Sequence, residues 1–225
     1  SFADYVSAEL VEPVAHVVTP ETAKVPGRPG AVLLSADVEP LELKVRLFVD
    51  APDALTVMQR SEARRTLRAW LLSTGGANLV VPGEPRLVWH DTGVSDWSSL
   101  LSDGSAVVTF LCLDPIAYGD RATTDARFFG VDGTWESWPE IVMTAGAGGS
   151  VRVADDVSGS YVLVERAFAG GERVYVNCGA QEVAVDGEDA EKDVALGSDF
   201  FALAPGEHEL AFEGCSEHVV SWNDR

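Results

Sequence analysis

The feature that most constrains this chain is a series of seven or eight short strand-like segments that follows Trp138 without any helical pattern. Segments such as SVRVAD, RVYVNC and HELAFEG alternate apolar with polar residues or hold short β-branched runs. Turns that contain glycine separate most of them, for example at Gly170 and Gly171 and at Gly187. Short strands with regular turn punctuation are typical of an antiparallel β-sandwich. We therefore expect the C-terminal part to be such a sandwich.

The N-terminal part combines a regular strand with one helix. In LELKVRLFVD, residues 41–50, apolar and charged side chains alternate, which predicts a half-buried strand. In SEARRTLRAWLLSTGG, residues 61–76, the apolar residues instead recur at helical spacing. Ser61 is the expected N-cap, and Gly75 with Gly76 marks the expected end. We expect no other helix in the chain with comparable support.

The stretch AYGDRATTDARFFGVDGTW, residues 117–135, is polar, rich in turn residues and without a period. We therefore place the domain boundary near Gly130, which divides the chain into domains 1–130 and 131–225. The expected fold class is mainly β. An N-terminal β-sandwich domain with one α-helix is followed by a C-terminal antiparallel β-sandwich.

The charge is strongly acidic, with 36 acidic against 16 basic residues and a net charge of −20. Residues 1–131 hold 17 acidic and 11 basic side chains, whereas residues 132–225 hold 19 and 5. Proteins that grip a nucleic acid neutralise its phosphates with positive charge. We therefore expect no bound DNA, although the same sign suits a wall past which DNA slides without sticking.

Membrane and export signals are not visible in the sequence. No run approaches the ~20 apolar residues that span a bilayer, and SFADYVSAEL lacks the basic and apolar regions of a signal peptide. Three cysteines are too few and too scattered for a disulfide framework. We expect synthesis in a reducing cytoplasm, with a bridge between Cys178 and Cys215 as the minority alternative.

The segment KVPGRPGAVLLS, residues 24–35, packs two prolines and two glycines around one arginine. A phosphate-binding loop needs a lysine and then a helix after its glycines, and AVLLS provides neither. A turn is the preferred interpretation, since Pro26 presets its φ and Gly27 tolerates a positive φ. We expect Pro26, Gly27 and Gly30 to shape a turn that delivers the next strand into the main sheet of the N-terminal domain. We expect Arg28 to donate hydrogen bonds to the carbonyls of this turn.

Residue types that carry chemistry do not converge on a catalytic or metal site. The chain has no G-x-S-x-G sequence, and Cys112 lies in an apolar strand pattern. A zinc site would draw on Cys178, His208, Cys215 and His218, but only the last two have ligand spacing. Strand parity places His208 inward, and the acidic run 186–193 lacks the order of a calcium loop. We expect neither catalytic residues nor a metal or other cofactor.

Aromatic residues leave one alternative open. Several of them gather near the predicted boundary or lie on the predicted strands: Phe128, Phe129, Trp135, Trp138, Tyr161 and Tyr175. Core and interdomain packing is the preferred explanation, because aromatic side chains supply much of the buried apolar area in a sandwich. A carbohydrate-binding module for attachment to a host surface stays as the alternative.

The order of these pieces resembles a known family. A VPGRPG turn, the strand LELKVRLFVD, the helix EARRTLRAWLLS and the segments PGEPRLVW and FLCLDPIAYG follow one another. This order is similar to the N-terminal belt domain of the distal tail proteins of siphophages, the long-tailed, non-contractile phages. The second half, with LAPGEHELAF and the final VVSWNDR, resembles the galectin-like sandwich that follows the belt in that family.

The resemblance implies a structural role in the virion. Distal tail proteins form a ring, usually of six copies, that joins the tail tube to the tip complex and lets DNA pass through its lumen. The expected partners are therefore further copies of the chain, the tail tube protein, tail-tip and tail-associated proteins, and the tape measure protein. The expected location is the phage tail, with assembly in the host cytoplasm. At 225 residues the chain has no room for the inserted carbohydrate-binding module that larger members carry.

One candidate subunit interface follows from the helix. Arg60, Arg64 and Arg68 share a helical face on an otherwise acidic chain, so they are able to meet carboxylates of a neighbouring copy. The competing explanation is an ordinary solvated face, because exposed ion pairs contribute little. A tube subunit is the nearest rival within phage tails, and it would stack into long cylinders.

Overall fold

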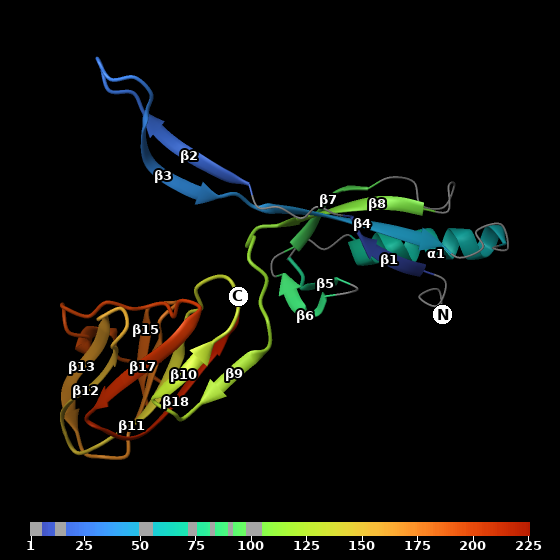
Figure 1. The fold of residues 1–225 in the computed structure, drawn as a ribbon. Helices are drawn as coiled ribbons and strands as arrows, with labels where there is room; N and C mark the ends of the chain where they lie inside the picture. The colour runs from blue at the N-terminus through green and yellow to red at the C-terminus, as the bar shows by residue number, and fades with distance from the viewer. Residues whose placement is uncertain are drawn as a thin grey trace. The chain divides into compact units, whose positions relative to one another are not determined.

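The computed structural model describes residues 6–11, 17–49, 56–71, 76–81, 84–89, 92–97 and 105–225. The chain divides into two compact units, Ser1–Ala117 and Tyr118–Arg225, which are treated separately below. Antiparallel strands make up most of both units (Figure 1), so the expected mainly β fold class is confirmed. No helix in the described part of the chain combines the length and the apolarity that crossing a bilayer requires.

The first unit is built on a four-stranded antiparallel sheet in the order β1-β4-β8-β7. Its strands are β1 (Val6–Leu10), β4 (Leu41–Val49), β8 (Ser105–Cys112) and β7 (Thr92–Trp97). The predicted alternation of β4 is confirmed, since Leu41, Leu43 and Val45 are buried and the charged residues between them are exposed. Leu41 and Leu43 form a small core with Cys112, as a strand with one apolar face requires.

Two two-stranded ribbons and one helix complete the first unit. The ribbons are β2 (Val18–Ala23) with β3 (Val32–Val38), and β5 (Leu79–Val81) with β6 (Glu84–Trp89). The helix α1 is Val57–Leu71, close to the predicted position. Among the described residues, β2 and β3 pair only with each other (Figure 1).

The helix begins four residues before the predicted N-cap. Thr56 Oγ1 accepts a hydrogen bond from the Gln59 amide at 3.3 Å, and Gln59 Oε1 accepts one from the Thr56 amide at 2.9 Å. This reciprocal pair is a capping box, which satisfies two amides that the first helical turn leaves without partners. The prediction of Ser61 as N-cap is therefore wrong, because Ser61 lies within the helix.

The second unit is a sandwich of two antiparallel sheets. The four-stranded sheet has the order β10-β17-β12-β13, and the six-stranded sheet has the order β16-β15-β14-β11-β18-β9. The strands are β9 (Arg121–Thr124), β10 (Phe128–Val131), β11 (Glu140–Ala145), β12 (Gly148–Asp155), β13 (Tyr161–Phe168), β14 (Arg173–Asn177), β15 (Glu182–Val185), β16 (Glu188–Asp189), β17 (Gly206–Glu213) and β18 (Cys215–Asn223). A 3-10 turn, Glu191–Asp193, follows β16.

The core of the second unit consists mainly of alternating inward residues of both sheets. Valine supplies many of these positions, and Ile141, Met143, Leu203 and Leu210 are its largest fully buried side chains. Phe129 stacks on Trp222 within this core, with ring centroids 4.7 Å apart. The second half, which the sequence predicts to be rich in short strands, therefore forms a sandwich in which two apolar inner faces pack on each other.

The division between the units lies earlier than the expected boundary at 130/131. The polar stretch before Gly130 forms β9 and β10, which pair with β18 and β17 near the end of the chain. Short polar strands at sheet edges have weak periodicity, and their partners lie far away in the sequence. The stretch therefore resembles a linker in sequence although it belongs to the second unit.

Candidate functional site

The ribbon of β2 and β3, called the arm below, exposes apolar side chains. Val18 on β2 and Leu33 and Leu34 on β3 are each more than half exposed, and Leu34 reaches 60%. Leu33 and Leu34 lie where the pairing register shifts: Thr22 pairs with Leu33 and Glu21 with Ser35, so Leu34 is the extra residue of a bulge. Apolar side chains concentrated on a short exposed element are a common mark of an interaction surface.

The tip of the arm contains the four residues predicted to shape a turn. Pro26, Gly27, Arg28 and Gly30 lie between β2 and β3, and both glycines have positive φ values of 81° and 87°. The Arg28 amide donates to the Val25 carbonyl at 3.1 Å. This bond is made by the backbone, and the hydrogen bonds expected from the Arg28 guanidinium stay a prediction.

The turn delivers β3 to a different place than expected. The sequence suggested that the next strand would enter the main sheet, but β3 pairs with β2 in the separate arm. The tip is also basic, because Lys24 and Arg28 lie in it and no acidic residue lies between Glu21 and Asp37. A basic tip on a chain of net charge −20 is electrostatically suited to an acidic partner.

The arginine row of α1 is placed only in part. Arg60, Arg64 and Arg68 all lie within the helix Val57–Leu71. Their side chains are outside what the structure describes, and the interface that they were expected to form stays a proposal.

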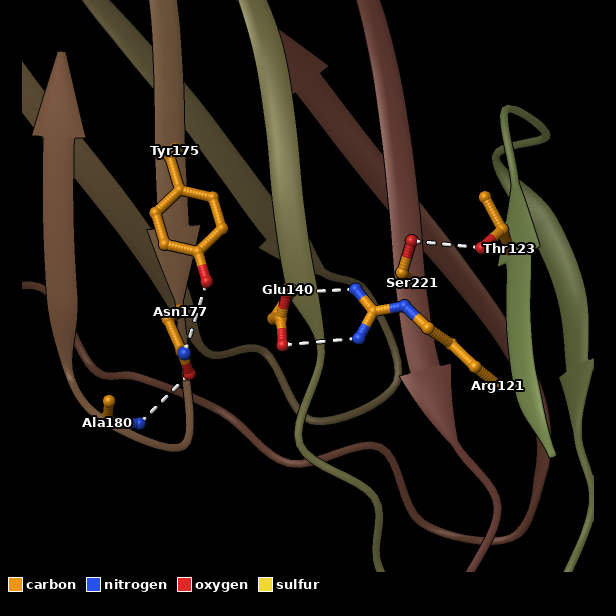
Figure 2. Close-up of polar contacts among 7 residues, drawn as sticks. All are labelled: Arg121, Thr123, Glu140, Tyr175, Asn177, Ala180 and Ser221. Carbon is orange, nitrogen blue, oxygen red and sulfur yellow. Dashed lines mark hydrogen bonds and ion pairs between the residues drawn. The ribbon is translucent and has the colours of Figure 1, made fainter. Parts of the chain in front are cut away.

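The outer face of the six-stranded sheet carries an ordered group of polar side chains (Figure 2). Arg121 donates two hydrogen bonds to the carboxylate of Glu140, at 2.8 and 3.4 Å. The bond from Arg121 lowers the pKa of Glu140, and the same bond raises the pKa of Arg121. Asn177 donates to the hydroxyl of Tyr175 at 3.2 Å and accepts from the amide of Ala180 at 3.0 Å.

A buried histidine–carboxylate pair links three segments of the second unit. His208 Nδ1 lies 3.1 Å from Asp155 Oδ1, and Nε2 lies 2.7 Å from the carbonyl of Ala204. Asp155 also accepts hydrogen bonds from the amides of Val157 and Ser158. Burial by itself raises the pKa of Asp155, but the bonds from Ser158 and His208 outweigh it and the net pKa is lowered.

His208 is a core residue, as its strand parity predicted, and its partners serve the fold. It is 2% exposed, and its ring faces that of Phe129 at 6.3 Å between centroids. The ring contacts the buried carboxylate of Asp155 and the backbone carbonyl of Ala204, which lies in the exposed segment before β17. Hydrogen bonds of this kind satisfy polar groups that burial removes from water, and they fix the local structure.

The cysteines and histidines do not assemble into a metal site. Within the described part of the chain, no three histidine, cysteine or acidic side chains converge in a way that could hold a metal ion. Cys112, Cys178 and Cys215 are free thiols. Burial raises the pKa of Cys112 to about 11 and that of Cys178 to about 12, so both are protonated core residues and poor nucleophiles.

The aromatic residues considered for a saccharide platform divide into two groups. Phe129 is buried, and Tyr161 lies beneath the guanidinium of Arg152 at 4.7 Å. Phe128, Trp135 and Trp138 are exposed. Tyr175 belongs to the polar group of Figure 2, which sequence reasoning missed because its members come from strands paired over long sequence separations.

Comparisons with known proteins agree with this architecture. Residues 132–225 match the family described as "Siphovirus-type tail component, C-terminal domain". None of the curated proteins matches this sequence. One similar solved structure is the crystal structure of the Dit protein (gp 19.1) of phage SPP1, with a sequence identity of 17% and a TM-score of 0.83. That protein is described as a paradigm of the hub adsorption apparatus in phages that infect Gram-positive bacteria. The alignment covers 99% of this chain and 94% of that protein.

A second solved structure is more distant. The baseplate of phage p2 in its activated conformation with Sr contains a chain that is 9% identical, with a TM-score of 0.51 and coverage of 97% of this chain and 90% of that one. At these identities the structures establish likeness of fold. Together with the family match of residues 132–225, they confirm the resemblance that the order of sequence segments had indicated.

Proposed function

We propose that this chain, whose residues 132–225 carry the siphovirus-type tail component domain, is a structural protein of a phage tail tip or baseplate. The likeness to the Dit protein of phage SPP1 over nearly the whole chain supports a role in a tail hub. The proposal assigns no catalytic activity to the protein. Its location is then the virion, after assembly in the cytoplasm of the host bacterium.

The finer proposal is a closed ring of copies, six in number, that joins the tail tube to the tip complex. The exposed arm is the observation that carries it, because the arm presents exposed apolar side chains and a basic tip. An arm that docks on the next copy makes a heterologous interface, and such an interface generates a ring when its rotation closes. The net charge of −20 supplies each copy with acidic surface for the basic tip.

The ring also accounts for the excess of negative charge. A lumen lined by a protein this acidic repels the phosphates of DNA, so DNA in transit does not adhere to the wall. The partners of the ring are the tail tube protein, tail-tip and tail-associated proteins, and the tape measure protein. The arginine row of α1 is a second candidate contact between copies.

The arm can be tested with a double substitution. We expect Leu33→Ser together with Leu34→Ser to abolish ring formation, because it removes exposed apolar area from the arm. The fold should persist, since both side chains are already exposed in the single chain. The measurement is negative-stain imaging of the purified protein and of assembled tails, together with mass in solution.

Leu196→Ser is the matched control, because Leu196 is a fully exposed leucine in the second unit, outside the arm. Rings formed by wild type and by the control, but not by the double variant, would support the proposal. If rings persist in the double variant, the arm is not part of the interface between copies. Long stacked cylinders of the wild-type protein would indicate a tube subunit instead.

A further inference from the structure

One row of residues on the outer face of the six-stranded sheet is polar across five strands. The pairing register places these residues side by side: Thr123, Ser221, Glu140, Asn177 and Glu182. Each is exposed or half-buried, whereas the neighbours Ile141, Val176 and Val220 point into the core. The face is therefore open to solvent and presents a continuous row of hydrogen-bonding groups.

Two side chains near the middle of this row are held in fixed orientations. The two bonds from Arg121 fix the plane of the Glu140 carboxylate, and the bonds to Tyr175 and Ala180 fix the Asn177 amide (Figure 2). A guanidinium has five N–H donors and an amide group has two, so both retain donors beyond these contacts. Planar groups held in place lose little entropy when they bind a partner.

An exposed indole lies beside these polar groups. Trp138 precedes Glu140 by two residues and has the same outward parity, because the residues that alternate with them, Ser137, Pro139 and Ile141, are buried. The neighbouring position is glycine, and a Cβ at Gly179 would lie 3.1 Å from Trp138 Cβ and 3.6 Å from Asn177 Oδ1. The small residue leaves room between the indole and the amide.

The combination of these groups selects a chemical class of ligand. Sugars present pairs of adjacent hydroxyls, which planar carboxylate, amide and guanidinium groups bind in bidentate fashion, and C–H faces, which pack on indole rings. An anionic polymer is disfavoured because residues 132–225 hold 19 acidic and 5 basic side chains. A neutral saccharide presents the hydroxyls and C–H faces that these groups bind, and it carries no negative charge for the acidic unit to repel.

We propose that this face is a binding site for a neutral saccharide, with Trp138 as the stacking platform and Glu140, Asn177 and Arg121 as the hydrogen-bonding groups. The site lies within the second unit and does not depend on ring formation. It would give the tail tip a weak contact with cell-surface sugars, repeated once per copy, and repetition raises the effective affinity.

Saturation-transfer NMR on the full chain tests the site with three defined probes: lactose, maltotriose and the trisaccharide of β1,4-linked N-acetylglucosamine. We expect at least one sugar to receive saturation from the wild-type protein. Trp138→Ser should weaken its binding by about tenfold or more, because buried aromatic anchors dominate such contacts. Trp135→Ser is the matched control: Trp135 is exposed to a similar extent, and its amide bonds to the Arg225 carbonyl, whereas Trp138 lies beside Gly179 and Asn177.

Asn177→Ala provides a second variant if Trp138→Ser fails to fold, which circular dichroism would reveal. Loss of transfer in either folded variant, with transfer retained in the control, would support the site. The proposal is overturned if none of the three sugars receives saturation, or if both folded variants bind as wild type does. It is also overturned if Trp138→Ser impairs docking of another tail protein while no sugar binds.

Discussion

At the scale of single residues, the buried contact of His208 with Asp155 shows how sequence separation limits prediction. The inward position of His208 follows from its parity with Leu210 and Phe212, and burial of all three confirms it. Its partner lies 53 positions away, and the two meet only because β12 and β17 pair in one particular register. Local pattern therefore predicts which side chains are buried but leaves their polar partners undetermined.

The pair makes the second unit sensitive to acid. The pKa of Asp155 is lowered in the folded protein, so its contribution to stability is present above the unfolded value of about 3.9 and is lost as pH falls through the folded pKa. We expect Asp155→Asn to cost about 3 kcal/mol at pH 7, because it leaves buried groups without their charged partner. The difference between wild type and variant should shrink as the pH falls below about 4 and then through the lower folded pKa, because only below that folded pKa is the carboxylate protonated in both states.

Urea unfolding at pH 7, 5 and 3 measures this difference. Glu172→Gln is a suitable control, since Glu172 is an exposed carboxylate that also accepts backbone amides, from Ala169 and Gly170. A loss of stability in Asp155→Asn that is equally large at all three pH values would show that the carboxylate charge is not responsible.

At the scale of elements, the strands and the helix were predictable where their pattern is local. The alternation in residues 41–50 and the helical spacing after residue 61 both identify real elements. The start of α1 was missed because its signal is a polar pair, Thr56 and Gln59, rather than an apolar period. The arm was missed because its turn was recognised but the partner of the following strand was not.

The capping box should contribute measurably to the helix. We expect Thr56→Ala to destabilise the first unit by about 1 kcal/mol, because the Gln59 amide loses its acceptor. Chemical denaturation followed by far-ultraviolet circular dichroism measures this change. Ser61→Ala, at the position first predicted to be the cap, should be close to neutral; a larger cost there than at Thr56 would contradict the assignment.

At the scale of the whole molecule, the division into two mainly β units was predictable but its position was not. Composition and turn spacing indicate two β regions, whereas the membership of β9 and β10 depends on pairing with β18 and β17, which lie far later in the sequence. The polar face of the second unit was unpredictable for the same reason. Its row of side chains exists only once five strands are in register.

Two separate cores predict two unfolding events. Leu43 is fully buried in the first unit and Leu203 in the second. Truncation of a buried leucine to alanine typically costs about 2–5 kcal/mol, so we expect Leu43→Ala to lower one calorimetric transition and Leu203→Ala the other. A single transition that both substitutions lower equally would show that the units unfold together.

The arm has one further consequence, which concerns how a free subunit avoids polymerising in the wrong way. Within the described residues, β2 and β3 have no other strand beside them, so each has an unpaired edge. Unpaired edges can pair with the edges of other chains and form fibres. Pro20 cannot donate from its backbone nitrogen, the register slips between Glu21 and Thr22, and Glu21 and Asp37 add repulsive charge. These features discourage strand-by-strand growth, so recognition of a neighbour is left to side chains, whose fit can end at a fixed number of copies.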